Sequence, residues 1–256
     1  PPHPARGPPP PPPRSAVDQA PILRDLARNH AGRFMAALGL SLLWGAAPYA
    51  LVIYLPLYAQ RFSGVTPHAS YVASLAGNLA LVAGSLTAGA IADRLGVRRM
   101  LVAATVMLIV LPAPILNMLK SHPDTPTMIA VAASLCGLVA LFVGAAPLGI
   151  ASLFPSRIRA TGIALSYNAA VALFGGFAPA LLASLGLAWH GVPSAALYVA
   201  LAGLPALAAL LSPPFAHASH AAHSAENSMN LAEKSIPPPS GRNGTLPTVI
   251  RDERPS

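Results

Sequence analysis

Two long apolar runs are separated by the charged sequence Gly89-Ala-Ile-Ala-Asp93-Arg94-Leu-Gly96-Val-Arg98-Arg99. Three arginines and one aspartate within seven residues are too costly to place in hydrocarbon, so this sequence predicts a short loop at a membrane surface. The two glycines of the loop let the backbone turn tightly there. On charge alone, the loop is an anchor that sets the orientation of its neighbouring helices through the positive-inside rule.

The composition is that of an integral membrane protein. Of the 256 residues, 54% are hydrophobic and 9% are charged, whereas about 25% of the residues in a soluble domain are charged. The formal net charge of +8 is scattered over loops and tails, without a basic stripe interleaved with aromatic residues, so no nucleic acid is expected as a partner. The expected partner is the lipid bilayer with its anionic cytoplasmic leaflet. The single cysteine, Cys136, excludes a disulfide within the chain.

Six apolar runs are each close to the length of about 20 residues that crosses a bilayer as a helix. They cover residues 34–58, 70–92, 100–119, 127–150, 161–187 and 193–212. Arginines gather before the first run and in the second and fourth loops: Arg24, Arg28, Arg33, Arg94, Arg98, Arg99, Arg157 and Arg159. The positive-inside rule therefore predicts a multi-pass protein of the cell inner (plasma) membrane with both termini in the cytoplasm.

The flanking segments are polar. Nine of the first thirteen residues are proline, so residues 1–33 are expected to be a disordered lead followed by a cytoplasmic amphipathic segment. Residues 213–256 are expected to be a disordered cytoplasmic tail. Its histidines at 217, 220 and 223 have a spacing that could place a metal on a helix, but such tracts are more often solvated, so neither a metal nor a cofactor is expected. No nucleophile–base pair lies at membrane depth, so the chain is not expected to be an enzyme.

The spacing G-x-x-x-D-R-x-G-x-R-R in the 89–99 loop resembles the signature loop of the major facilitator superfamily of transporters. In that family the loop follows the second and the eighth helix, and its aspartate and arginines latch neighbouring helices. The resemblance implies a gating role as an alternative to the anchor. The residues to which this role carries over are Gly89, Asp93, Arg94, Gly96, Arg98 and Arg99.

A second motif begins at Leu153-Phe-Pro155-Ser-Arg157-Ile-Arg159-Ala-Thr-Gly162 and continues through Tyr167-Asn168 to Gly175-Gly176-Phe-Ala-Pro179. Pro155 ends one helix, the two arginines hold the cytoplasmic surface, and Gly162 lets the next helix pack closely. The two glycines and the proline at its far end weaken the fifth run in mid-membrane, where a broken helix is tolerated only if protein or water satisfies its backbone.

This motif resembles the tenth-to-eleventh helix region of the metabolite:proton symporters, the branch that includes carriers of proline and betaine, citrate, 2-oxoglutarate and shikimate. The resemblance covers residues 34–212 and implies an all-α fold, the carboxy-terminal six helices of a twelve-helix transporter. It also implies that this second cytoplasmic loop has a gating role together with the 89–99 loop, with Pro155, Arg157, Arg159 and Gly162 as its candidate residues. One departure is Ser152, which stands where that family usually has a glutamate.

Polar and aromatic side chains within the runs are candidates for a substrate cavity. Tyr54-Leu-Pro-Leu-Tyr58 forms either an aromatic belt at the outer interface or a cavity wall, and it resembles a seventh-helix sequence of the same symporters. Asn78 and Ser85 share a helical face with Ser74, which should look into a bundle or cavity. The candidates are Tyr49, Tyr54, Asn78, Ser85, Tyr167, Asn168, Gly175, Gly176 and Pro179.

The expected function is secondary active transport by alternating access, with a small organic metabolite and a proton moving together. The metabolite is an organic acid or a compound of the proline or betaine type. Because the family's substrate path runs between two six-helix halves, an amino-terminal half is expected as a partner, and a fragment, a truncated frame and a split gene all remain open. The central parts of the runs lack ionisable residues, so the coupling acid is expected in that other half. The alternatives are a sugar or drug carrier of the same superfamily, and a non-transporting scaffold or remnant.

Overall fold

The structure, a computed structural model, describes residues 26, 28–178, 180–182, 184, 193–213 and 215. Within these residues the secondary structure is helical and contains no strand. The elements are α2 (Ala31–Pro48), η2 (Tyr49–Ile53), α3 (Leu55–Phe62), α4 (Pro67–Leu95), α5 (Val97–Val110), α6 (Pro112–Ser121), α7 (Thr125–Val143), α8 (Ala146–Ser152), α9 (Arg159–Ala170), η3 (Val171–Gly175) and α11 (Ser194–Leu211).

Five helical segments are long and apolar enough to cross a membrane, namely Ala31–Ile53, Pro67–Leu95, Val97–Ser121, Thr125–Ser152 and Ser194–Leu211. Each contains most of one of the apolar runs predicted at 34–58, 70–92, 100–119, 127–150 and 193–212. The remaining run, 161–187, which is the fifth in chain order, includes α9 and η3, and these are not among the five. The predicted arginine-rich segment before α2 is only partly described, and Arg33 belongs to α2 itself.

Local sequence explains where the long helices begin and end. The Thr66 hydroxyl accepts a hydrogen bond from the Ala69 amide at 3.4 Å and caps α4, and Pro67 occupies its first turn. The Asp124 carboxylate caps α7 in the same way, 3.2 Å from the Thr127 amide. Gly96 is the only residue between α4 and α5 and has φ of 89°, a conformation that side chains disfavour.

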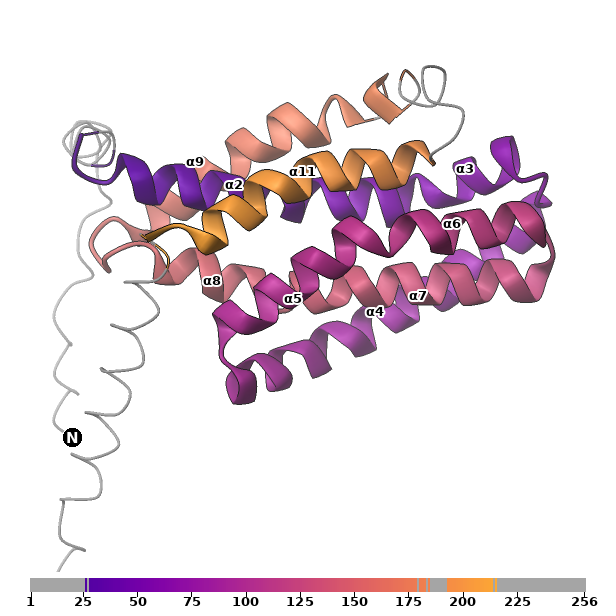
Figure 1. The fold of residues 1–256 in the computed structure, drawn as a ribbon, viewed down its shortest axis with the longest axis horizontal. Coiled ribbons are helices and arrows are strands. Elements are labelled where there is room, and N and C mark those ends of the chain that lie inside the picture. Colours follow the sequence, from indigo (N-terminus) through magenta and orange to yellow (C-terminus); the bar gives the residue numbers. More distant parts are fainter. Residues whose placement is uncertain are drawn as a thin grey trace, which may run out of the picture. The chain divides into compact units, whose positions relative to one another are not determined.

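Two sets of packed helices organise the fold. In one, α4 lies along α7, which also contacts α5 and α6; in the other, α2 contacts both α11 and α9 (Figure 1). The α4–α7 contact is close because its residues are small. A Cβ added to Gly77 would lie 2.8 Å from the Cys136 sulfur, and one added to Gly84 would lie 2.7 Å from Ala140 Cβ. Helices in membranes approach closely through such small residues.

The order of the contacts gives the directions of these helices. Along α4, Gly77 meets Ala132 and Cys136, while further on Gly84 meets Ala140. The residue numbers rise together on the two helices, so α4 and α7 run parallel. Parallel packing requires the intervening segment α5–α6 to return in the opposite direction, as an alternating series of crossings does.

The outward face of α4 is apolar. Only 17% of the most apolar 18-residue stretch of α4 is buried inside the structure, compared with 61% for the corresponding stretch of Ala31–Ile53. Its exposed large side chains are Tyr71, Val72, Leu75, Leu79, Val82, Leu86, Ile91 and Leu95. A face of this kind is stable against hydrocarbon or another apolar helix but not against water.

Candidate functional site

Two of the helices contain a π-helical turn. The Tyr54 amide donates to the Tyr49 carbonyl at 2.9 Å, and the Gly176 amide donates to the Val171 carbonyl at 3.0 Å. Both bonds join residues five apart, so each helix is locally wider than an α-helix. We call the segments Tyr49–Ile53 and Val171–Gly175 the paired π turns. Single π turns inside helices occur frequently at functional sites.

The segment η3 packs against α2, and Tyr49, the first residue of η2, contacts Gly175, the last residue of η3. The Val171 side chain lies 3.6 Å from the Cβ position of Gly45, and the Tyr49 ring lies 3.1 Å from the Cβ position of Gly175. Closer to the amino-terminal ends of the two segments, the ring centroids of Trp44 and Tyr167 are 4.6 Å apart. The numbers again rise together, so α2–η2 and α9–η3 run parallel.

A third helix completes this cluster. Tyr198 of α11 is buried, its hydroxyl donates to the Phe174 carbonyl within η3, and its ring lies 5.8 Å from the Phe174 ring. Trp44, Phe174 and Tyr198 were not among the candidates predicted from the sequence. Tyr198 is the only tyrosine in an otherwise apolar run, and because a buried tyrosine hydroxyl usually finds a partner, this isolated hydroxyl is the signal that could have identified it.

The structure brings three of the predicted cavity residues into this cluster, namely Tyr49, Tyr167 and Gly175. Asn168 and Gly175 are seven residues apart, a spacing that places two residues on the same face of a regular α-helix. Asn168 is instead exposed and donates to the Ala164 carbonyl at 2.7 Å, while Gly175 is buried. The π turn between them explains the difference, because seven residues no longer make two turns.

The remaining cavity candidates lie elsewhere. Asn78 is exposed on α4 and donates to the Ser74 carbonyl at 2.8 Å, and Ser85 donates to the Val82 carbonyl at 2.9 Å. Tyr54 packs against Tyr58, with 6.4 Å between ring centroids. Gly176 is exposed at the end of η3. Pro179 lies outside the described residues, as do His217, His220 and His223.

The 89–99 loop is more helical than the sequence predicts. Asp93 and Arg94 belong to the last turn of α4 and are exposed, and Gly89 faces open space. Asp93 makes no ion pair with any residue that the structure describes. A carboxylate near a helix carboxy terminus is unfavourable, so Asp93 gains from a cationic partner.

The two arginines after Gly96 differ in their surroundings, because Arg98 is hydrogen-bonded to another helix and Arg99 is exposed. The Arg98 Nε atom donates to the Leu210 carbonyl at 3.1 Å and so joins the start of α5 to the last turn of α11. Arg99 is exposed. A cation at a helix carboxy terminus is favourable, so Arg98 stabilises the end of α11.

The second predicted gating segment connects α8 to α9. Pro155 and Arg157 are exposed, and the Arg159 Nε atom donates to the Phe154 carbonyl at 3.3 Å. A Cβ at Gly162 would lie 2.8 Å from the Phe154 ring, which is buried. Gly162 therefore makes room for a side chain from the preceding turn.

The paired π turns contain two aromatic side chains, Tyr49 and Phe174, and one side-chain hydroxyl, that of Tyr49, and no charged side chain belongs to either turn. Among the described residues, no group of three or more metal-binding side chains is present.

No protein-family model and no solved structure matches the chain. The chain is 27% identical over 122 residues to a citrate-proton symporter from Klebsiella pneumoniae. The match covers 48% of this chain and 28% of the length of that symporter. Together, this similarity and the apolar helices indicate an integral membrane protein with a role in transport.

Proposed function

We propose that the chain is the carboxy-terminal six-helix half of a secondary active transporter of the major facilitator superfamily. In this proposal it moves a small organic metabolite together with a proton by alternating access. The metabolite is an organic acid or a compound of the proline or betaine type. The similarity to a citrate-proton symporter supports proton-coupled symport and favours an organic acid.

The direction of α9–η3 supports one further membrane crossing in addition to the five long apolar helices. In an alternating series of spans, the first and the fifth run in the same direction because three crossings lie between them. The contacts of Gly45 with Val171 and of Tyr49 with Gly175 place α2–η2 and α9–η3 parallel, as this series requires. We therefore assign residues 161–187 as the fifth of six spans.

The observation that carries the proposal is the contact between the paired π turns. A π turn can return to α-helical pairing by a shift of one residue, which rotates the side chains beyond it. Two such turns held together by Tyr49 and Gly175 can change in concert and so alter one wall of a cavity. Tyr49, Tyr167 and Gly175 are the residues that we assign to this wall.

Charged groups at the loops support a gating role and a partner half. Asp93 and Arg94 are exposed at the end of α4, whose apolar outer face is also exposed. An amino-terminal half packed along α4 would cover this face and bring cations to Asp93. The coupling acid then belongs to that half, since the described spans carry charged residues only near their ends.

Uptake into right-side-out membrane vesicles tests the proposal. The vesicles come from source cells with the gene intact, with the gene deleted, and with the deletion complemented by Tyr49→Ala. Labelled citrate, 2-oxoglutarate and glycine betaine are supplied with and without an inward proton gradient. We expect deletion of the gene to abolish the gradient-driven uptake of at least one of these compounds. Complementation with Tyr49→Ala should return the protein to the membrane but restore less than a tenth of the uptake.

Two results contradict the proposal. In one, deletion leaves the uptake of all three compounds unchanged; in the other, deletion lowers uptake that a protonophore does not affect. Complementation with Leu204→Ala, a change at an exposed position of α11, is the control for the loss of a large side chain. Uptake restored equally by Tyr49→Ala and Leu204→Ala would remove Tyr49 from the cavity wall.

A further inference from the structure

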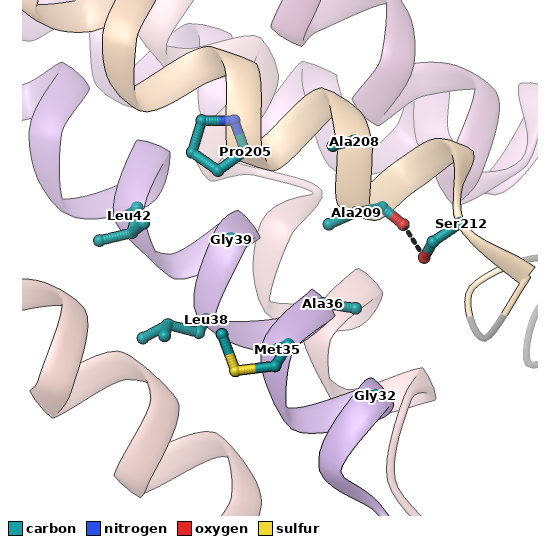
Figure 2. A pocket seen from close by; sticks show the side chains of 10 residues that line it. All are labelled: Gly32, Met35, Ala36, Leu38, Gly39, Leu42, Pro205, Ala208, Ala209 and Ser212. Atoms are coloured by element: carbon teal, nitrogen blue, oxygen red, sulfur yellow. Dashed lines mark hydrogen bonds between the residues drawn. The ribbon is translucent and has the colours of Figure 1, made fainter.

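A shallow groove runs between α2 and α11, with a volume of about 400 Å³. Figure 2 shows Gly32 and Ser212 at one end of the groove and Leu42 and Pro205 at the other. Met35, Leu38 and Ala208 lie between the two ends. Gly39 allows the two helices to approach closely, because a Cβ there would lie 2.7 Å from the Pro205 carbonyl oxygen. Apart from Ser212, the residues that line the groove are apolar or glycine.

Three arginines flank the end marked by Gly32 and Ser212, outside the residues that line the groove. Arg33 follows Gly32 directly in α2 and is partly exposed, and the exposed Arg28 precedes it by five residues. Arg98 reaches the same end, because its Nε atom donates to the Leu210 carbonyl two residues before Ser212. An apolar groove with cations at one end is complementary to a molecule that carries an anion on an apolar chain.

The length of the groove matches one leaflet of a bilayer. Ten residues of helix separate Gly32 from Leu42, which is about 15 Å at about 1.5 Å per residue. The hydrocarbon core of a bilayer is about 30 Å thick, so the groove extends from one surface to about the midplane. Because the arginine-rich loops are expected on the cytoplasmic side, the leaflet concerned is the cytoplasmic one.

We propose that this groove binds an anionic phospholipid of the cytoplasmic leaflet. Its headgroup lies at Arg33 and Arg98, and one acyl chain lies along Met35, Leu38 and Leu42. A second copy of the chain fits less well, since two copies with the same orientation in the membrane would bring their Arg33 and Arg98 side chains together. The proposal is independent of the transported substrate.

Lipid titration of the full 256-residue chain in detergent micelles tests this site. The probes are phosphatidylglycerol and phosphatidylcholine with identical acyl chains, and the readouts are the thermal shift and the number of lipids retained in native mass spectrometry. We expect tighter binding of phosphatidylglycerol. Arg33→Gln should weaken that binding about fivefold, the value of one arginine near an anionic headgroup, and leave phosphatidylcholine unchanged. Ala208→Phe, which fills the groove from an exposed position, should weaken both lipids.

The controls are Arg61→Gln, an exposed arginine of α3, and Leu204→Phe, an exposed position of α11 that does not line the groove. Both should bind lipid as the unaltered chain does. Equal affinity for the two lipids, or a preference for phosphatidylglycerol that survives Arg33→Gln, would overturn the proposal. A dimer that Ala208→Phe dissociates without loss of lipid would also overturn it, because a second copy would then cover the groove.

Discussion

Tyr198 illustrates how much a single buried hydroxyl contributes inside a membrane bundle. Its partner is the Phe174 carbonyl in a π turn, and its ring packs on the Phe174 ring. Removing only the hydroxyl leaves the ring contact in place and an acceptor without its donor. We expect Tyr198→Phe to lower the free energy of unfolding in mixed micelles by about 1 kcal/mol, a typical value for one hydrogen bond between membrane helices.

The matched control is Tyr71→Phe, because the Tyr71 side chain is 68% exposed on α4. Its free energy of unfolding should equal that of the unaltered chain. An equal loss for both variants would mean that the Tyr198 hydroxyl adds nothing specific to η3.

Asp124, which precedes the span Thr125–Ser152, makes the stability of the chain depend on pH. Hydrogen bonding with Thr127 is the main cause that holds the pKa of Asp124 below its usual range. The ionised form is thus favoured by folding, so its contribution is complete above the ordinary aspartate pKa of about 3.9 and is lost as the pH falls through the lower folded value. Asp124→Asn keeps an equally good cap but cannot titrate.

Thermal unfolding in micelles at pH 6 and at pH 3 measures this effect. We expect the transition temperature of the unaltered chain to fall more between these two values than that of Asp124→Asn. Parallel changes in the two proteins would show that the carboxylate makes no difference to the cap of α7.

At the scale of helices, the contact between α4 and α7 depends on small residues, glycine and alanine. Gly84→Ala would place its Cβ 2.7 Å from Ala140 Cβ, where neither group can rotate away. Overpacking of this kind costs about 1–3 kcal/mol, so we expect a loss of that size in the free energy of unfolding. Denaturation in mixed micelles is the measurement.

Gly137→Ala is the matched control, because nothing lies within 4 Å of the Cβ position at Gly137 in α7. Alanine is a better helix former, so this variant should be unchanged or stabilised by up to about 1 kcal/mol. If Gly137→Ala destabilised the chain as much as Gly84→Ala does, close packing would not explain the glycine in α4.

The helices themselves were largely predictable, and their irregularities were not. A run of about 20 apolar residues has few alternatives to a membrane helix, which explains why five of the six predicted runs coincide with long helices. The motif glycines marked weak points in the fifth run, but the register of its hydrogen bonds depends on packing against α2. The sequence therefore indicated Tyr49 and Gly175 as separate candidates, and only the structure pairs them.

Polar residues on helices were harder to place, because a helix can satisfy them alone. Asn78 and Ser85 were expected to need a partner across the bundle. Both instead donate to carbonyls of their own helix at 2.8 and 2.9 Å. Arg98 shows the opposite case, since its partner, the Leu210 carbonyl, lies 112 residues away and no sequence spacing predicts it.

At the scale of the whole molecule, the function that we propose depends on which loops share a side of the membrane. Two crossings separate the start of α5 from the α8–α9 connection, and two separate the start of α4 from the loop before α7. Single cysteines at Leu95 and Ala160, both exposed, should therefore face one side. Single cysteines at His68 and His122, also exposed, should face the other. Each is introduced into a background in which the native Cys136 is replaced by alanine.

A membrane-impermeant maleimide applied to intact cells distinguishes the two sides. We expect labelling at positions 68 and 122 without permeabilisation, and at positions 95 and 160 only after the membrane is opened. This result follows from arginine-rich loops that stay in the cytoplasm, and it would orient Asp93 toward the same compartment as Arg157. Labelling of positions 95 and 160 from opposite sides would mean an odd number of crossings between them. The parallel arrangement of α4 and α7 and the gating role of both loops would then have to be abandoned together.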